Sequence, residues 1–351
     1  MLYHKRVVID LKKVFIAAYA YIAALIGAGF ASGQEILCYF NRFGRYGFYG
    51  VIIAALIFSV FAYIIFYTCI RIKAESFDDF LSIFPGRHTS RIFRCITGVF
   101  SFAVFAVMLA AFAEICAYTI GIPQKFGALI AAAVCAVILC HSPDGIITLN
   151  GLIGIILAIG IAYCCFYILR YREFHAFSYS GEITGSAFIY SGYNLVTVLP
   201  VLTVTGRRLH NGTDAAASAI ISGIVLFILM SLIFCILAIY EGRVNLGEFP
   251  MLTMAYRQNK ILGFFYGLLL GASIITTLLS SAESVSEAFA LRKKHIRAAA
   301  VAVFAYMLSG AGFGTLVDTA YRITGIIGFV ICGIVSVLCI KTISKSKIRD
   351  I

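Results

Sequence analysis

Three glycines, a serine, a glutamine and a carboxylate interrupt an apolar run in the stretch LIGAGFASGQE, residues 25–35. Each glycine lowers helix propensity by up to about 1 kcal/mol relative to alanine. Gly27 and Gly29 lie near the middle of the run, and Gly33 follows one turn later. Peptide groups released from a helix there can coordinate a cation through carbonyl oxygens or hold a carboxylate through amides. Small residues also let helices pack closely, so this stretch alone leaves both interpretations open.

A second polar interruption lies in the stretch GSAFIYSGYNLVTVLPVL, which begins at residue 185. Ser191, Gly192, Tyr193 and Asn194 stand near the middle of this apolar segment. Gly29 and Gly192 are 163 residues apart. Matched interruptions in corresponding helices of two halves indicate a binding site between inverted repeats. We therefore predict that the helix unwinds here as well.

A stripe of hydroxyl side chains recurs at helical spacing in the stretch GASIITTLLSSAESVSEAF, which begins at residue 271. Thr276 and Thr277 lie near the middle of this segment. Hydroxyl oxygens suit hard cations such as Na⁺, although Ser and Thr in membrane helices often bond back to their own helix. The pair predicts a sodium site or a structural feature of the helix.

Two carboxylates, Glu35 and Glu114, fall within apolar segments. An ionised carboxylate at the centre of a membrane span costs at least about 2.5 kcal/mol, so both are candidates for a gate or a proton site. Glu114 stands near the end of its segment, where a paired, interfacial role is the alternative. Asp318 and Arg322 are one turn apart and are expected to pair with each other or across an outer vestibule.

The elements that must position these groups are membrane-spanning helices. Hydrophobic residues make up 62% of the 351, charged residues only 13%, and the mean hydropathy is +0.98. A soluble domain cannot bury so much apolar surface, so the excess must face lipid. With about 20 apolar residues per span, we predict ten helices in one membrane domain. They cover roughly 14–40, 47–70, 93–120, 126–141, 147–170, 183–205, 214–240, 261–290, 296–313 and 316–340.

The net charge of +12 reports orientation in the membrane and requires no nucleic-acid partner. With a cytoplasmic N-terminus, the inner segments carry 19 of the 28 Lys and Arg residues, as the positive-inside rule favours. The even count of spans places both termini in the cytoplasm of a multi-pass plasma-membrane protein. Five spans fall in each half, residues 1–175 and 176–351, so the second half enters the membrane inverted.

The motifs GAGFASGQE, IYSGYN and TT resemble those of the YkvI-type membrane proteins. These are amino acid permeases of the amino acid–polyamine–organocation superfamily, and the resemblance covers essentially the whole chain. It implies an all-α LeuT-like fold of five plus five inverted helices, with the first and sixth broken.

The resemblance also implies roles for particular residues. The amides of Ala28 and Gly29 would face a substrate carboxylate, with the residues of 191–194 lining the same cavity. The carbonyls of Ala23 and Ile26 would complete a sodium site with Thr276 and Thr277. The arginine gate of the neurotransmitter symporters has no counterpart at residues 33–35, and we expect Glu35 to pair with Arg322 instead.

These observations predict a Na⁺- or H⁺-coupled symporter of amino acids or related small zwitterions, working by alternating access. A non-transporting sensor or receptor on the same fold is the alternative. No G-x-x-x-x-G-K-[ST] or H-E-x-x-H motif occurs, so we expect neither ATP hydrolysis nor an intramembrane enzyme. We predict no cofactor apart from a possible Na⁺. The sequence leaves open the substrate, the coupling ion, the direction of transport and the oligomeric state.

Overall fold

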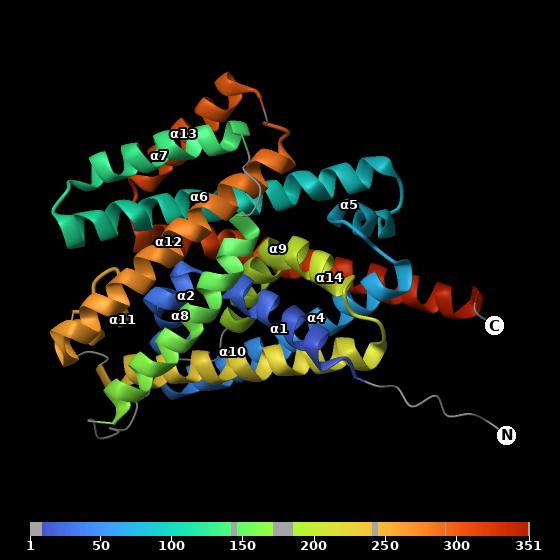
Figure 1. Ribbon diagram of the computed structural model, residues 1–351, viewed down its shortest axis with the longest axis horizontal. Helices are drawn as coiled ribbons and strands as arrows, with labels where there is room; N and C mark the ends of the chain where they lie inside the picture. Colours follow the sequence, from blue (N-terminus) through green and yellow to red (C-terminus); the bar gives the residue numbers. More distant parts are fainter. Residues whose placement is uncertain (1–8, 142–145, 171–184, 241–244, 292, 350–351) are drawn as a thin grey trace.

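The computed structural model describes residues 9–141, 146–170, 185–240, 245–291 and 293–349, which form helices joined by short links (Figure 1). In chain order these are α1 (Leu11–Leu25), α2 (Ala28–Ser32), α3 (Gln34–Tyr39), η1 (Asn41–Tyr46), α4 (Gly47–Ile72), α5 (Phe77–Phe80), η2 (Leu81–Ile83), α6 (Arg87–Ile120), α7 (Gln124–His141), α8 (Ile146–Leu169), α9 (Ser186–Gly206), α10 (Gly212–Tyr240), α11 (Pro250–Gln258), α12 (Lys260–Ala288), α13 (His295–Ser309) and α14 (Phe313–Arg349).

The predicted spans correspond to these elements. Within the described part of the chain, six helices are long and apolar enough to cross a membrane: α4 together with η1, α6, α9, α10, α12 and α14. The described part of α8, α7 and α13 are shorter apolar helices. Helices α1, α2 and α3 follow one another along the first predicted span. The prediction of an all-helical, multi-pass membrane protein is confirmed.

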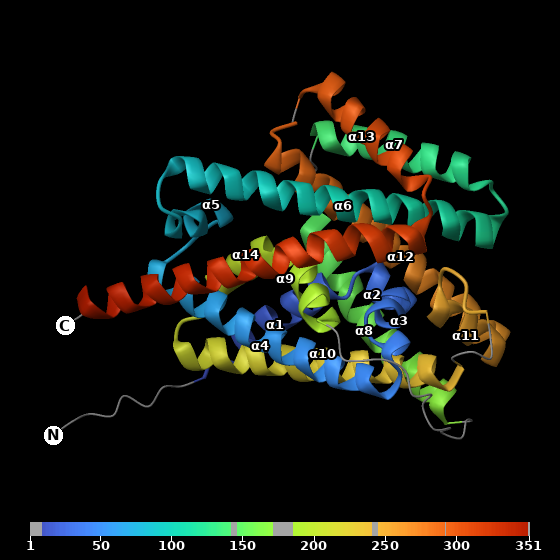
Figure 2. The same cartoon turned by 180° about the vertical axis from the view of Figure 1, so that it is seen from behind.

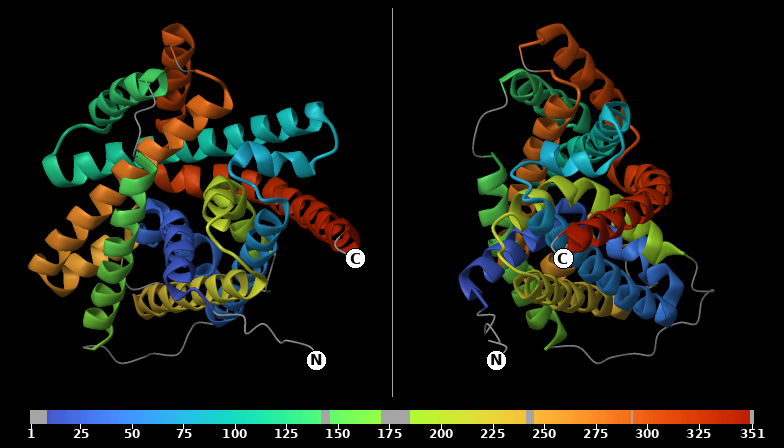
Figure 3. Two further views of the ribbon diagram at one scale, coloured as in Figure 1. Left: turned by 45° about the vertical axis from the view of Figure 1, so that its right-hand side comes forward. Right: turned by 90° about the vertical axis from the view of Figure 1, so that its right-hand side faces the viewer.

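Helix α1 enters the interior of the bundle with its second half, where Tyr21, Ile22 and Leu25 are buried. It contacts α8, α9 and α10, while the short helix α2 contacts α12. Helices α7 and α13 pack against each other and against α6, and they form an outlying layer at one edge (Figure 2). The two further views in Figure 3 show the same layer projecting from the rest of the bundle. The broken segment therefore lies where peptide groups can be shielded from lipid, as a membrane helix requires.

The outward face of α14 shows how the apolar composition is used. Its exposed aliphatic residues recur every three or four positions, so they form one stripe along the helix. The opposite face, which includes Val335 and Cys339, is buried. An aliphatic stripe of this length suits the acyl chains of a bilayer. The exposed residues are Ile323, Ile326, Ile327, Val330, Ile334, Val337 and Ile340.

One end of the bundle gathers the start of α1 with the ends of α4 and α9. The Lys13 ammonium contacts the His210 ring, and the Asp10 amide donates to Asp214 Oδ1 at 3.3 Å. At the same end, Arg207 Nη1 donates to the Glu75 carbonyl at 2.8 Å. Helix α14 also ends on this side (Figure 1). The opposite end carries η1, α11 and the start of α14.

The predicted break at residues 191–194 is wrong. Helix α9 runs uninterrupted through these residues. Asn194 Nδ2 donates to the Tyr190 carbonyl one turn earlier, at 3.0 Å. Gly192 lies at a helix crossing, since a Cβ atom there would overlap the Gly325 carbonyl oxygen of α14. The glycine permits close packing of α9 on α14, the role that small residues often have in membrane helices.

Candidate functional site

The first span breaks between α1 and α2, as the glycines predicted. Ile26, the last residue bonded into α1, has φ −82° and ψ 72°, and Gly27 is extended with φ −83° and ψ −177°. The Gly27 amide bonds to the Leu25 carbonyl at 3.0 Å, and the next helical turn starts from the Gly27 carbonyl. The break releases peptide groups from the α-helical pattern. They lie in the protein interior, because Ile26 and Ala28 are 2% and 1% exposed.

A second irregularity separates α2 from α3 at Gly33. This residue has φ 81°, a left-handed conformation that glycine adopts without steric cost. Ser32 Oγ donates to the Gly29 carbonyl at 2.8 Å and accepts from the Gln34 amide at 3.1 Å. Met251 of α11 packs on Gly33, leaving 2.8 Å between its Cγ and a Cβ placed there. The side chain of Met251 is fully buried, so α11 covers this part of the site.

Helix α12 brings one of the two predicted threonines to the break. A Cβ atom placed on Gly27 would lie 3.7 Å from Thr277 Oγ1. The neighbouring Thr276 hydroxyl bonds back to the Ala272 and Ser273 carbonyls, each at 3.1 Å. Bonding of a hydroxyl to its own helix was the alternative to a sodium site for these two threonines. Such a bond leaves the Thr276 hydroxyl oxygen able to act as a ligand as well. Of the two threonines, Thr277 therefore stands against the unwound backbone.

The other components of the predicted cation site lie in the last turn of α1. Ala23 is 3% exposed and packs against Gly154 of α8, where a Cβ would lie 3.2 Å from the Ala23 carbonyl oxygen. Ile26, whose carbonyl belongs to the same predicted set, ends the helix. Backbone carbonyls and a hydroxyl are hard oxygen donors of the type that Na⁺ accepts. The donor chemistry of these residues thus fits an alkali cation.

Glu35 lies directly against the broken segment. It comes from the first turn of α3, is 5% exposed, and folds back so that its carboxylate abuts Gly29. A Cβ added to Gly29 would be 2.9 Å from Glu35 Cδ. The side chains of Tyr190 and Tyr193 are neighbours of this carboxylate. Glu35 Oε2 nevertheless has no hydrogen-bond partner of normal geometry among the described residues.

Four buried tyrosines from three helices surround this carboxylate. Tyr39 comes from α3, Tyr190 and Tyr193 from α9, and Tyr321 from α14, and none is more than 3% exposed. The rings of Tyr193 and Tyr321 are stacked with centroids 4.4 Å apart. The ring centroid of Tyr39 lies 5.6 Å from that of Tyr190 and 6.1 Å from that of Tyr193. We call Glu35 with these four residues the tyrosine cluster.

The four predicted residues of α9 each have different surroundings. Tyr193 belongs to the tyrosine cluster, and its hydroxyl has no hydrogen-bond partner among the described residues. Ser191 is fully buried, and its Oγ is likewise without a partner in the described part of the chain. Asn194 bonds to its own helix, and Gly192 faces α14. Of the four, Tyr193 places its ring against Tyr39, which belongs to the same predicted span as the break.

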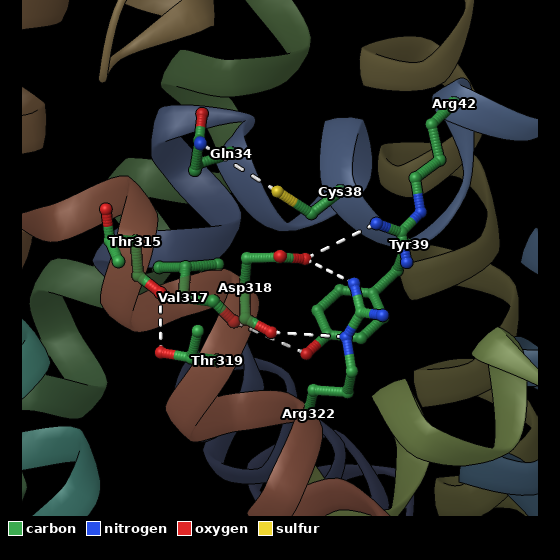
Figure 4. A network of polar contacts seen from close by, with 9 residues as sticks. All are labelled: Gln34, Cys38, Tyr39, Arg42, Thr315, Val317, Asp318, Thr319 and Arg322. Carbon is green, nitrogen blue, oxygen red and sulfur yellow. Dashed lines mark hydrogen bonds and ion pairs between the residues drawn. The ribbon is translucent and has the colours of Figure 1, made fainter.

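The predicted pair between Glu35 and Arg322 is wrong. Arg322 Nη2 instead binds Asp318 Oδ1 at 2.5 Å, one turn away on α14. This is the pair that the spacing of Asp318 and Arg322 predicted. Arg42 of η1 reaches the same carboxylate oxygen at 3.3 Å (Figure 4). The hydroxyl of Tyr39 donates to the Val317 carbonyl at 3.5 Å beside this network. Asp318 thus holds both arginines while Glu35 points inward to Gly29.

Glu114 lies apart from the tyrosine cluster. Its carboxylate accepts a hydrogen bond from the Gln124 side chain at the start of α7. This contact joins the end of α6 to α7, so the residue is paired, as one of the two alternatives in the sequence stated.

Residues missed in the sequence join the start of α11 to the start of α14. Glu248, which precedes α11, accepts a hydrogen bond from the Gly314 amide in the first turn of α14. The rings of Phe249 and Phe313 meet next to it with centroids 5.4 Å apart. Tyr190 could have been identified from the sequence, because it stands three positions before Tyr193 and shares its helix face. Tyr39 and Tyr321 carried no such signal.

The long apolar helices and the interior break define the class as a multi-pass membrane protein, and the similarity to a solved structure gives it the LeuT-like fold. No protein-family model matches the chain. The inward-facing structure of Mhp1 is similar, with a TM-score of 0.54 and 14% identity over 91% of this chain and 69% of that chain. The manganese transporter of Eremococcus coleocola gives a TM-score of 0.48 and 13% identity, covering 96% of this chain and 87% of that chain.

A full-length relative confirms the resemblance that the motifs indicated. The membrane protein YkvI of Bacillus subtilis (strain 168) is 24% identical over 339 residues, which cover 92% of this chain and 95% of that protein. The chain is therefore a homologue of YkvI.

Proposed function

We propose that the protein is a secondary transporter of amino acids or related small zwitterionic solutes, coupled to a Na⁺ or H⁺ gradient. The observation that carries this proposal is the interruption of the first helix at Ile26–Gly27, deep within the bundle. Such a break is tolerated only inside protein or beside a wet cavity, and in transporters it forms the binding site. The similarity of fold to Mhp1 supports the same assignment.

The solute would bind between the broken helix and the tyrosine cluster. The peptide groups of Ala28 and Gly29 would receive the polar group of the solute, with Tyr193 beside it. Ser191 supplies a buried hydroxyl on the same helix as Tyr193 and, with Asn194, belongs to the proposed cavity of the open states. The work requires no covalent step, because movement of the bundle exposes the site to each side in turn. The free energy comes from the ion gradient.

The cation would bind to the carbonyls of Ala23 and Ile26 and to the hydroxyls of Thr276 and Thr277. Binding at this point would hold the end of α1 against α12, so the ion and the solute would stabilise the same arrangement of the broken helix. That shared effect is what couples the two ligands energetically.

The distribution of basic residues supports an inward-facing position for both termini. Lys13, Arg94 and Arg207 lie at the end of the bundle where α1 begins and α4 and α9 end. The positive-inside rule assigns this end to the cytoplasm. The Arg42–Asp318–Arg322 network then lies at the outer end.

Uptake into proteoliposomes tests the proposal. With an inward Na⁺ or H⁺ gradient, we expect the purified protein to accumulate radiolabelled amino acids above protein-free vesicles. Binding without accumulation would instead indicate the sensor, and absence of both would refute the proposal.

Replacement of Thr277 tests the choice of cation. If Na⁺ drives uptake, Thr277→Val should abolish the Na⁺ dependence, because valine keeps the shape and removes the oxygen. Thr203→Val is the matched control, since the Thr203 hydroxyl is buried and bonds to the Pro200 carbonyl of its own helix. Unchanged sodium dependence in Thr277→Val would exclude Thr277 as a ligand.

A further inference from the structure

Glu35 is a buried carboxylate that has no counter-ion among the residues that the structure describes. Arg42 and Arg322, the arginines of the neighbouring network, are held by Asp318. Among the described residues no lysine or arginine forms an ion pair with Glu35. Burying an ionised group without a partner is strongly unfavourable. The site is thus arranged for a positive charge that arrives from outside the chain.

The surroundings of Glu35 suit an organic cation. The faces of tyrosine rings attract cations that come within about 6 Å of the ring centroid, and ammonium ligands are recognised in this way. Tyr39, Tyr190, Tyr193 and Tyr321 supply four such rings around one carboxylate. Tyr193 Oη and Glu35 Oε2 also remain available as hydrogen-bond acceptors. An ammonium group offers three N–H donors together with the missing charge.

The position of Glu35 relative to Gly29 connects this feature to the solute site. The carboxylate abuts the first turn after the break, where no side chain intervenes. A ligand held at the peptide groups of residues 28–29 would therefore have its positive group within reach of Glu35. A ligand that carries only a carboxylate would meet a second negative charge there.

We propose that Glu35 and the surrounding tyrosines form an ammonium-recognition subsite, so that the protein selects solutes by their protonated amino group. This inference rests on the proposed transport of small zwitterions and specifies which of their two charges is required. Solutes that keep the amino group and lack the carboxylate bind, whereas those that keep only the carboxylate do not.

Two sets of matched compounds test this selection by direct binding to the detergent-purified protein, measured by calorimetry. The first set is leucine, isopentylamine and 4-methylpentanoate, and the second is phenylalanine, 2-phenylethylamine and 3-phenylpropionate. We expect an amine and an amino acid of at least one set to bind, with the corresponding acid at least tenfold weaker. Binding of an acid as tight as that of its amine, or no binding by either amine, would overturn the proposal.

Variants of Glu35 identify the residue responsible. Glu35→Gln keeps the size and removes the charge, and it should weaken amine binding by about 10- to 100-fold, the range for a charge-assisted hydrogen bond. Glu35→Asp keeps the charge and should weaken amine binding less than Glu35→Gln does. The matched control is Glu114→Gln, which removes a carboxylate outside the tyrosine cluster and should bind amines as the unaltered protein does.

The unfolding temperature of each variant separates loss of the subsite from loss of the fold. Glu35→Gln should unfold no earlier than the unaltered protein, because a neutral amide is less costly to bury than a carboxylate. Amine binding unchanged in Glu35→Gln would overturn the proposal even where proteoliposomes accumulate amino acids. Conversely, amine binding that depends on Glu35 in a protein without uptake would refute transport and leave the subsite standing.

Discussion

Substitution of Gly192 by alanine tests whether this glycine serves packing or unwinding. In the structure a Cβ at this position would overlap the Gly325 carbonyl oxygen and lie 2.5 Å from the Phe329 amide nitrogen. Normal contacts between such atoms are about 3.5 Å, so α9 and α14 would have to separate by about 1 Å. Because these atoms belong to the backbone, no side-chain rotation can relieve the overlap.

The expected cost follows from two opposing effects. Overpacking of a well-packed interior costs about 1–3 kcal/mol. Alanine recovers up to about 1 kcal/mol of helix propensity relative to glycine. We therefore expect Gly192→Ala to lower the free energy of unfolding by about 1–2 kcal/mol.

Unfolding of the purified protein by increasing amounts of denaturing detergent measures this change. Gly333→Ala is the matched control, because Gly333 is also in a long helix and a Cβ there meets open space. It should leave the stability unchanged or raise it slightly. If Gly192→Ala proves as stable as Gly333→Ala, the close crossing of α9 and α14 does not exist. The helix break predicted at residues 191–194 would then be the better explanation of this glycine.

Two further substitutions have definite expected outcomes. Gly29→Ala should displace the Glu35 carboxylate, because the new Cβ takes its space, and amine binding measured by calorimetry should fall at least tenfold. Gly333→Ala, where the new Cβ meets open space, should bind as the unaltered protein does; equal loss in both would refute the contact. Asp318→Asn weakens the contacts with Arg42 and Arg322 but should lower the free energy of unfolding by less than about 1 kcal/mol, because the three side chains are 38–46% exposed. That loss should vanish in 1 M salt, as denaturation in low and high salt would show.

Much of the fold is encoded in patterns that a single sequence displays. Long apolar segments fix the spans, because each must cover the same thickness of hydrocarbon. The break at Gly27 was predictable, since two glycines two residues apart weaken a helix whatever packs around it. The break at Gly192 was predicted from the same composition and is absent. At Gly192 the neighbouring helix α14 decides the outcome, because two of its glycines approach the α9 backbone at this point.

The site was only partly accessible from the sequence for a related reason. Thr277 and Tyr193 could be identified because each lies in a polar stretch of its own helix. The tyrosine cluster also needs Tyr39 and Tyr321, which are ordinary aromatic residues until the packing of α3 on α14 brings them together. Predicting the partner of Arg322 requires the directions of the side chains, which charge and spacing do not determine. Glu35 turns toward Gly29, and Asp318 binds the arginines instead.

Access to Ser191 from the two sides of the membrane tests the central claim most directly. Ser191→Cys would be made after replacement of the eleven native cysteines, and it nearly preserves a side chain that is fully buried here. Ser218→Cys is the matched control, because the Ser218 hydroxyl is buried between α1 and α10 and bonds to the Val14 carbonyl at 3.1 Å. Membrane-impermeant thiol reagents would be added outside or inside sealed vesicles.

We predict that Cys at position 191 reacts from both sides, that bound amine slows both reactions, and that position 218 reacts from neither. Reaction from one side only, under every ion gradient, would contradict alternating access around the broken first helix.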